Sequence, residues 1–228
     1  MNRIKQISNL IEKCQCVYDV GSDHALLAIN LLKARKVKQV VNIEKNWLPH
    51  NAGKANLAKN HLTTKTINVL NDGLKDITKK VFIQPDYVVI AGMGGKAIVN
   101  ILKKDLSKLE NVETLVIDAH SCIPFLREEI SKVGYSISDE KIIKEDGIFY
   151  EIIRFSKSDI AFYSDDDIEF GPILRKEKSA LFKEKYQSRI DEINNLINSK
   201  KLPYNRISIL TDEKVKLETI LWLKWGKF

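Results

Sequence analysis

Val17-Tyr18-Asp19-Val20-Gly21-Ser22-Asp23-His24-Ala25-Leu26-Leu27 decides the fold of this chain. An apolar run ends in the carboxylate of Asp19, turns through one glycine and continues into an amphipathic helical pattern. In open α/β sheets, such a strand delivers an acid at its carboxyl end, the glycine lets the backbone approach a ligand, and the helix N-terminus points towards that ligand. The stretch therefore predicts the first β-loop-α unit of a nucleotide-binding sheet.

The number of glycines in this turn indicates which nucleotide it suits. A dinucleotide-binding turn that cradles a pyrophosphate carries three glycines, whereas this turn has only Gly21. Asp23 would also repel a phosphate from the place it prefers. The turn therefore favours a cationic ligand without phosphate, such as S-adenosylmethionine, which carries a sulfonium, an amino group and a ribose. An ordinary strand-to-helix turn without a ligand is the alternative.

Length and composition set the outer limits. The chain has 228 residues, 44% hydrophobic and 29% charged, which is typical of a globular protein with one core and a small appendage. No stretch approaches the roughly 20 apolar residues of a membrane span, and the N-terminus lacks the pattern of a signal peptide. Cys14, Cys16 and Cys122 are odd in number and match no metal spacing, so we expect reduced thiols in a cytoplasmic protein.

The charge of the chain bears on its partners. The net charge is +7 and the isoelectric point is about 9.1. A basic surface gains affinity for nucleic acid by releasing counterions from phosphates, so this charge favours a nucleic-acid partner. A chain rich in lysine and isoleucine can also reflect AT-rich coding, and the charge alone leaves both explanations open.

Two further strands end at an acid. Residues 39–44 form a β-branched run that closes on Glu44, where a carboxylate can take ribose hydroxyls. Residues 66–70 form another strand, which runs into the turn Asn71-Asp72-Gly73. We assign Asp72 to the adenine amino group, with its two neighbours shaping the wall. A solvated loop at Glu44 and a simple turn at Asp72 are the alternatives.

The next strand leads into a loop with three glycines. Residues 85–90 are apolar on both faces, as a central parallel strand should be, and continue into Ala91-Gly92-Met93-Gly94-Gly95 before a helix at 96–104. The missing Cβ atoms would let the main chain contact a methyl donor or a flat acceptor base. Close packing between helix and sheet is the alternative explanation.

The remaining periodic segments predict further helices and the last strands of the sheet. Helical spacing covers residues 2–13, 24–36, 52–60 and 124–133. Strands are expected at residues 113–118, 135–141 and 149–155, with a hairpin turn at 144–147. Together these elements predict an α/β fold with a seven-stranded, mostly parallel sheet closed by an antiparallel strand.

The last third of the chain has a different pattern. Residues 156–170 include Ser164-Asp165-Asp166-Asp167, which is either an acidic linker or a helix N-cap cluster, and a helix with a heptad stripe is expected from 172 to 200. A break at residues 202–205 precedes a second helix that finishes at Trp222 and Trp225. We expect the two helices to pair antiparallel, which gives domains at 1–157 and 158–228. The cationic side chains on the outer faces of these helices either bind phosphates or are only solvated. They are Arg175, Lys176, Lys178, Lys183, Lys185, Arg189, Lys200 and Lys201.

Four motifs together resemble one bacterial family. They are Asp19-Val20-Gly21-Ser22-Asp23-His24-Ala25, Ala91-Gly92-Met93-Gly94-Gly95, Glu145-Asp146-Gly147 with Tyr150-Glu151, and Gly171-Pro172-Ile173-Leu174-Arg175-Lys176-Glu177-Lys178. The pattern spans nearly the whole chain and resembles the bacterial tRNA (adenine-N1)-methyltransferases (TrmK family), which act on adenine 22 of the D-arm. The resemblance implies a class I, Rossmann-like, S-adenosylmethionine-dependent catalytic domain followed by a C-terminal α-helical coiled-coil hairpin.

Motifs and resemblance together assign the site residues. The expected cofactor contacts are Asp19, Gly21, Ser22, His24, Glu44, Asn71, Asp72, Gly73, Ala91, Gly92 and Met93. The expected substrate contacts are Gly94, Gly95, His120, Arg127 and Tyr150. Asp23 is the expected catalytic residue, because it lies just past the cofactor turn, where methyl group and base must meet.

The chain departs from the family pattern at two places. Leu26 and Ala28 stand where the family usually has Tyr and Pro. Asp118-Ala119-His120 stands where the family has Asn-Pro-Asn or Gln-Pro-Asn, whereas Arg127 is kept. These differences bear on the acceptor side more than on the cofactor site, since His120 can donate or accept a hydrogen bond in place of an asparagine amide.

The implied acceptor needs no general base. Adenine N1 keeps an in-plane lone pair at neutral pH and can attack a sulfonium methyl directly, so alignment should dominate, with about 7–11 kcal/mol available from near-attack geometry. The product base is cationic, which favours a nearby carboxylate such as Asp23. A target base in a helical stem must first be flipped out of the stack.

Two other functions are compatible with the sequence. One is a basic module that binds RNA and the cofactor without catalysis, and the other is a small-molecule methyltransferase. The lack of an aromatic lid or an apolar substrate insertion argues against the second, and the helical tail argues for a large acceptor. We expect a monomer that binds tRNA and has neither a metal nor a membrane segment.

Overall fold

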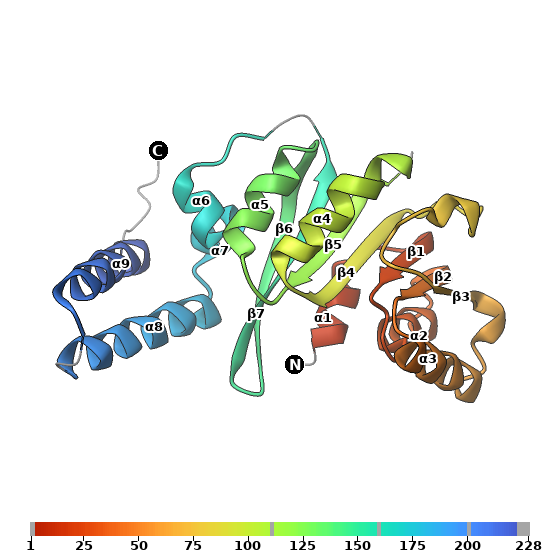
Figure 1. Cartoon of the computed structure of the whole chain (residues 1–228), viewed down its shortest axis with the longest axis horizontal. Coiled ribbons are helices and arrows are strands. Elements are labelled where there is room, and N and C mark those ends of the chain that lie inside the picture. The colour runs from red at the N-terminus through yellow and green to blue at the C-terminus, as the bar shows by residue number, and fades with distance from the viewer. Residues whose placement is uncertain (1–2, 110–111, 159–160, 200–201, 223–228) are drawn as a thin grey trace. The chain divides into compact units, whose positions relative to one another are not determined.

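The computed structural model describes residues 3–109, 112–158, 161–199 and 202–222 (Figure 1). The chain divides into two compact units, Met1–Glu169 and Phe170–Phe228. No helix among these described residues is both long and apolar enough to cross a membrane. The assignment of residues 1–157 and 158–228 to a catalytic and a helical domain stays a prediction.

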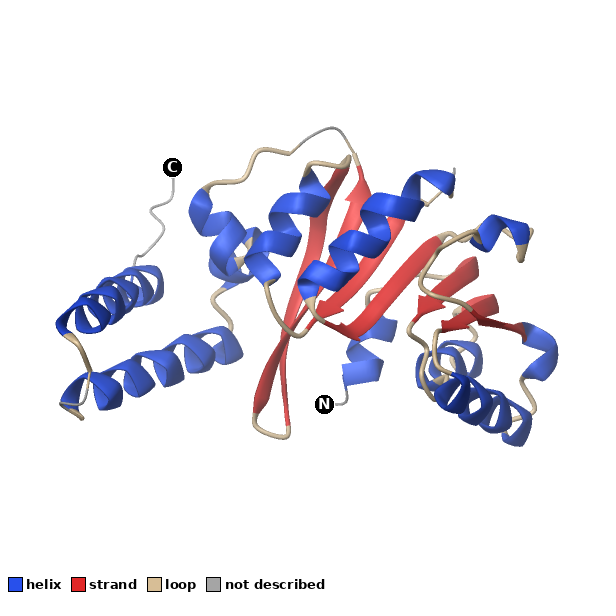
Figure 2. Cartoon of the chain, in the orientation of Figure 1, coloured by secondary structure: helices blue, strands red, loops and turns tan. Residues whose placement is uncertain are grey.

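The first unit is built on one seven-stranded sheet (Figure 2). Its strands are β1 Cys14–Val20, β2 Val37–Glu44, β3 Thr66–Leu70, β4 Tyr87–Met93, β5 Thr114–Ala119, β6 Tyr135–Glu145 and β7 Ile148–Lys157. The strand order is β3-β2-β1-β4-β5-β7-β6, and β7 runs antiparallel to both of its neighbours. The predicted mostly parallel, Rossmann-like α/β sheet is therefore confirmed.

Helices cover the two faces of the sheet, as parallel strands require. In the first unit they are α1 Arg3–Asn9, α2 Leu26–Lys33, α3 Trp47–Lys59, α4 Gly95–Asp105 and α5 Ile123–Ser131, with short 3-10 helices at Thr63–Lys65, Ile77–Lys79 and Leu106–Lys108. Helices α1, α2 and α3 pack on one face, whereas α4 and α5 lie against each other on the opposite face (Figure 1).

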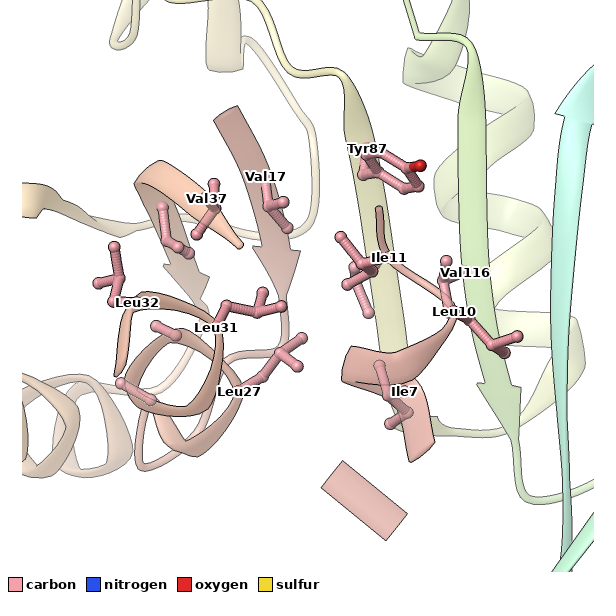
Figure 3. Close-up of a cluster of buried hydrophobic side chains, with 14 of the residues drawn as sticks. Ile7, Leu10, Ile11, Val17, Leu27, Leu31, Leu32, Val37, Tyr87 and Val116 are labelled. Carbon is pink, nitrogen blue, oxygen red and sulfur yellow. The ribbon is translucent and has the colours of Figure 1, made fainter. Parts of the chain in front are cut away.

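One buried cluster fixes α1 and α2 to the sheet (Figure 3). Ile7 and Ile11 from the start of the chain meet Leu27 and Leu31 of α2 over the strand residue Val17. All five side chains are at most 3% exposed. Complete burial of one such side chain contributes about 1.5–3 kcal/mol, so this cluster anchors the N-terminal segment beside the end of β1.

Two helix boundaries of the first unit differ from the sequence prediction by four residues or more. Helix α1 ends at Asn9 rather than 13, because the ammonium of Lys36 donates to the carbonyl oxygens of Ser8 and Ile11 at 2.7 and 2.9 Å. Helix α3 begins at Trp47 rather than 52, because the first turn of a helix tolerates a proline, here Pro49. The second difference brings the N-terminus of α3 next to the end of β2.

The second unit is helical, but the long helix predicted from 172 to 200 is wrong. It is split into α7 Pro172–Glu177 and α8 Ala180–Asn198, after α6 Asp165–Phe170. Lys178 has a left-handed backbone with φ 45°, and the hydroxyl of Ser179 accepts the N–H of Phe182 at 3.2 Å, which starts a new helix.

Helix α9, Tyr204–Trp222, packs against α8. Arg189 donates to both carboxylate oxygens of Glu213, at 2.7 and 3.1 Å, and these residues lie at similar distances from the connecting loop, so the helices run antiparallel. A true coiled coil stays a prediction. Among the predicted outer cations, Arg175 is buried and Arg189 is paired with Glu213. Lys200, Lys201 and Trp225 lie outside the described residues.

A buried ion cluster ties α5 to the antiparallel strands. The guanidinium of Arg127 contacts the carboxylates of Glu140, at 2.9 Å, and Glu151, and it donates to the carbonyl oxygens of Ile168 and Glu169 at 3.2 Å. Its side chain has no exposed surface, so it cannot touch an RNA substrate. The expectation that Arg127 binds substrate is wrong, because its guanidinium is buried and paired with two carboxylates.

Arg127→Met should lower the free energy of unfolding of the first unit by about 3–5 kcal/mol, because Glu140 and Glu151 then stay buried without a cation. Urea denaturation followed by circular dichroism measures the change. Lys132→Met is the matched control, since it removes an exposed cation at the end of the same helix and should change little. Equal effects of the two variants would contradict a structural role for the cluster.

Candidate active site

The carboxyl ends of four parallel strands meet at one edge of the sheet. The register pairs Val20 of β1 with Ile43 of β2 and Ile90 of β4, and it pairs Glu44 with Leu70 of β3. The strand order reverses between β1 and β4, and ligands of open α/β sheets bind at such a switch point. Acids and glycines far apart in the chain are therefore gathered in one place.

A cavity of about 880 Å³ lies at this edge. All eleven residues predicted to bind the cofactor line it, together with Asp23 and His120: Asp19, Gly21, Ser22, His24, Glu44, Asn71, Asp72, Gly73, Ala91, Gly92 and Met93. Four of the predicted substrate residues do not line it: Gly94, Gly95, Arg127 and Tyr150.

The turn after β1 uses its own N–H groups. Those of Gly21 and Ser22 both donate to the carbonyl oxygen of Ile43, at 2.8 and 3.1 Å, and that of Asp23 donates to Glu44 Oε2 at 3.2 Å. A phosphate-binding loop instead directs such N–H groups at the ligand. The local geometry therefore disfavours a phosphate, as the single glycine of the turn predicted.

Asp19 is the most strongly perturbed acid of the cavity. Its side chain lies at the end of β1 and is 4% exposed, and no donor in the described part of the chain reaches its carboxylate. Burial and, to a smaller extent, the negative charge of Glu44 raise the pKa of Asp19 to about 7. A ligand cation in the cavity would relieve this repulsion and favour the ionised carboxylate.

Glu44 is held in a fixed orientation. Its Oε1 accepts the N–H of Asn46 at 2.8 Å, and its Oε2 accepts the N–H of Asp23 at 3.2 Å. The two bonds tie the end of β2 to the first turn and to the start of α3. A carboxylate has about four acceptor positions, so Glu44 keeps capacity for donors on a ligand.

The turn after β3 is stabilised by an asparagine. The amide of Asn71 donates to the carbonyl oxygens of Gly73 and Lys75, both at 2.9 Å, and its backbone N–H donates to Glu44 O at 2.8 Å. The side chain of Asn71 is therefore occupied in shaping the loop. Asp72 is exposed and pairs with the ammonium of Lys45 at 3.1 Å.

The glycines of the turn after β1 and of residues 91–95 have two different environments. A Cβ on Gly21 would collide with the methyl group of Met93, and Gly92, at φ +81°, has nothing within 4 Å of where its Cβ would stand. Both glycines line the cavity, and Gly92 leaves open space beside it. A Cβ on Gly95 would lie 2.6 Å from the Ser121 carbonyl oxygen, so this glycine lets α4 pack against the next loop, as the alternative explanation proposed.

The assignment of Gly95 to the substrate is therefore corrected, because its missing Cβ accommodates protein, whereas that of Gly94, which is half-buried, stays a prediction. A Cβ on Gly94 would lie 3.1 Å from Ser121 Oγ. Tyr150 does not line the cavity either, but its ring packs edge-on against the ring of His120, with 5.5 Å between the centroids. Tyr150 thus lies beside a residue of the cavity, and its assignment to the substrate stays a prediction.

Sequence reasoning missed Arg3 and Glu145, which also line the cavity. The side chain of Arg3 reaches His120 Nε2 at 2.8 Å and Asp118 Oδ2 at 3.3 Å, and its backbone N–H donates to Glu145 Oε1 at 3.0 Å. No motif marks Arg3, because one arginine in an amphipathic helix resembles any solvated cation. Among the described residues, no group of three or more His, Cys, Asp and Glu could hold a metal ion.

Comparison with known proteins gives one consistent result. The TrmK family model, described as tRNA (adenine(22)-N(1))-methyltransferase, matches residues 17–218. The Bacillus subtilis tRNA (adenine(22)-N(1))-methyltransferase is 29% identical over 199 residues, which cover 85% of this chain and 82% of that protein.

Two solved structures extend the comparison. A Streptococcus pneumoniae protein in complex with S-adenosyl-L-methionine is 29% identical, with a TM-score of 0.85 over 96% of this chain and 98% of that chain. M. capricolum TrmK in complex with S-adenosyl-homocysteine is 25% identical, with a TM-score of 0.85 over 97% of each chain. The sheet, the strand-end cavity and these similarities agree, and the chain belongs to the tRNA (adenine(22)-N(1))-methyltransferase family.

Proposed function

We propose that the cavity at the carboxyl ends of β1 to β4 is where this protein transfers the methyl group of S-adenosylmethionine to N1 of adenine 22 in the D-arm of tRNA. Family membership makes the protein a tRNA (adenine(22)-N(1))-methyltransferase. The observation that carries the site assignment is Asp19, a buried carboxylate that no donor among the described residues reaches. It lines a cavity whose first turn offers no phosphate cradle. This chemistry fits a cationic nucleoside.

Three acids define the cofactor side of the cavity. Asp19 faces the positive charge of the methionine portion, Glu44 accepts the ribose hydroxyls, and Asp72 accepts the adenine amino group. The other contacts come from the turn Gly21 to His24, from Asn71 and Gly73, and from the loop Ala91 to Met93. Glycine at position 92 leaves open space that the flat nucleoside can use.

S-adenosylmethionine supplies a methyl group on a sulfonium, and the carbon–sulfur bond breaks as N1 of adenine bonds to the carbon. The chain has to align the acceptor rather than activate it, because N1 already carries its lone pair. Positive charge moves from the sulfur to the base, so carboxylates along this path stabilise both ends of the reaction. The acids that line the cavity meet this need.

Asp23 is the proposed catalytic residue. Its side chain is 65% exposed and lines the cavity beside the cofactor turn, with His24 Nε2 at 3.7 Å from its Oδ1. Its backbone has φ 45°, a left-handed conformation that few residues other than glycine, asparagine and aspartate adopt readily. The carboxylate is exposed at the cavity, where it can face the base that becomes cationic.

His120 frames the acceptor side, together with Arg3 and, behind it, Tyr150. A base paired in the D-arm stem has a hidden Watson–Crick edge, so adenine 22 must leave the stack to enter the cavity. We propose a cytoplasmic enzyme, since tRNA is its substrate. We also propose a monomer, because the described residues of one chain supply every proposed contact. Sedimentation at micromolar concentration checks the monomer.

The protein should transfer tritium from labelled S-adenosylmethionine to an unmodified tRNA transcript with adenine 22, and not to the same transcript with guanine at that position, because only adenine offers N1 as a free lone pair. Nuclease digestion should recover the label as 1-methyladenosine. The turnover number and cofactor affinity of the Asp23→Asn variant are then compared with those of the wild type. Asparagine is chosen because it tolerates the left-handed backbone and keeps the size of the side chain.

For Asp23→Asn, the turnover number should fall by about 10²-fold while cofactor affinity stays near that of the wild type, because only the reacting centre loses charge. Equal loss of affinity and turnover would reassign Asp23 to cofactor binding. Cofactor binding by the wild type without any transfer to tRNA would leave a binding module and refute the proposed function.

Cofactor affinity should fall as the pH drops below about 7, because Asp19 is then protonated in the free protein and binding must expel that proton. Between pH 7 and pH 6 the dissociation constant should rise by up to about tenfold, the limit for one linked proton. Titration calorimetry in buffers of different ionisation enthalpy measures both the affinity and the proton released.

Asp19→Asn is the matched control, since it keeps the shape of the side chain and removes the titrating group. Its affinity should be lower at pH 8 and nearly flat from pH 8 to pH 6. The sign for folding is opposite: the free folded protein holds a proton that the unfolded chain releases, so Asp19 costs stability as pH rises towards 7. An Asn variant with the wild-type slope would refute this assignment.

We further propose that the helical unit contributes to RNA binding. A chain that ends after Glu169 should keep its cofactor affinity, because every proposed cofactor ligand lies before residue 94. It should bind tRNA more weakly and with a shallower salt dependence, as fewer phosphates are neutralised. Binding of tRNA to both proteins across a salt series measures the two effects.

The position of the truncation matters for this test. Tyr163 Oη accepts the N–H of Ile137 at 2.7 Å, and Arg127 needs the carbonyl oxygens of Ile168 and Glu169. A chain that ends at 157 should therefore be less stable than one that ends after Glu169. Unchanged tRNA affinity and salt slope in the longer truncation would show that the first unit alone recognises the RNA.

A further inference from the structure

We propose that Arg3 is a positioning residue for methyl transfer, and that it acts through the imidazole of His120. This inference rests on the proposed function of the cavity and adds a residue that lies far from every sequence motif. Arg3 is the first residue of α1, and it lines the same cavity as Asp23 and His120.

Four separate contacts hold Arg3 in one orientation. Its backbone N–H donates to Glu145 at 3.0 Å, and its guanidinium lies 4.8 Å from the centre of the Tyr150 ring. The same guanidinium pairs with Asp118 at 3.3 Å and donates from Nη1 to His120 Nε2 at 2.8 Å. Few surface arginines have so many partners, so the position of this side chain is strongly determined.

The contact with Arg3 fixes the chemical state of His120. A guanidinium is a donor only, so Nε2 of His120 must supply the lone pair, and the proton of the neutral ring must be on Nδ1. The backbone N–H of His120 donates to Met93 O at 2.9 Å, which ties the same residue to the glycine loop. Arg3 thus leaves His120 a neutral donor beside a base that becomes cationic.

Asp118 keeps the charge of Arg3 in balance. Its carboxylate is completely buried, and neither of its oxygens has a hydrogen-bond partner in the described part of the chain, although the Nε of Arg3 lies 3.3 Å away. Burial raises the pKa of Asp118, and Arg3 opposes that rise. Asp118 therefore balances the charge of the Arg3 guanidinium, and the same guanidinium donates to His120.

A double-mutant cycle tests the proposal with Arg3→Met, His120→Ala and the combined variant in the full-length protein. Arg3→Met should lower the turnover number by about 10–100-fold, since small misplacements at a reacting centre have effects of this size. Cofactor affinity should be unchanged. In the His120→Ala background, Arg3→Met should cause no further loss, because the group through which it acts is gone.

Three control variants separate positioning from charge balance. Lys5→Met removes an exposed cation from the same helix and should keep wild-type turnover. Arg3→Lys keeps a charge beside Asp118 but cannot bridge Asp118 and His120 in the same fork, so it should stay slow. Asp118→Asn combined with Arg3→Met removes the buried charge together with its partner, and this variant should be folded and still slow.

The tautomer of His120 provides a readout that does not depend on activity. Nitrogen chemical shifts of the imidazole should show the proton on Nδ1 in the wild type and a changed shift pattern in Arg3→Met. Equal loss of rate from Arg3→Met in both backgrounds, or wild-type turnover in the Asp118→Asn combination, would overturn the proposal. A wild-type protein that methylates no tRNA would instead refute the function on which the proposal rests.

Discussion

Asp19 is a carboxylate that the parallel sheet buries at the end of β1, beside Glu44 and without a donor among the described residues. Burial of an unpaired charge is unfavourable. In the free protein this raises the pKa of Asp19 to about 7 and favours the neutral carboxyl group. A cationic ligand changes this balance, because it stabilises the ionised carboxylate and is held by it. The cavity is therefore matched to charge as well as to shape.

The same arrangement explains why a fold related to dinucleotide-binding sheets takes a different ligand here. In such sheets the first turn offers N–H groups to a pyrophosphate, whereas here those groups bind the end of β2. Glu44 is fixed by the same bonds, so the proposed ribose acceptor and the exclusion of phosphate have one common structural origin. Methyl transfer then moves a positive charge across an acidic cavity without changing the total charge.

Sequence periodicity identified the strands and their terminal acids correctly, because each of these signals is contained in a few neighbouring residues. It assigned Arg127 and Gly95 to the substrate incorrectly, because residue type alone does not reveal what surrounds a side chain. Arg127 is an ion-pair partner in the interior, and Gly95 accommodates the loop after β5. Arg3 was missed for the converse reason, since its partners lie more than a hundred residues away.

The sequence by itself determined the α/β class, the order of the strands along the chain, and the cavity residues from Asp19 to Met93, since patterns of burial and turn chemistry are local. The order of the strands in the sheet depends on the tertiary structure. So do the distinction between Gly92, which leaves space at the cavity, and Gly95, which packs against the next loop, and the position of Arg3 at the cavity. The physical reason is that burial and charge pairing arise between distant segments. The pKa of Asp19 and the bond between Arg3 and His120 exist only once those segments are packed together.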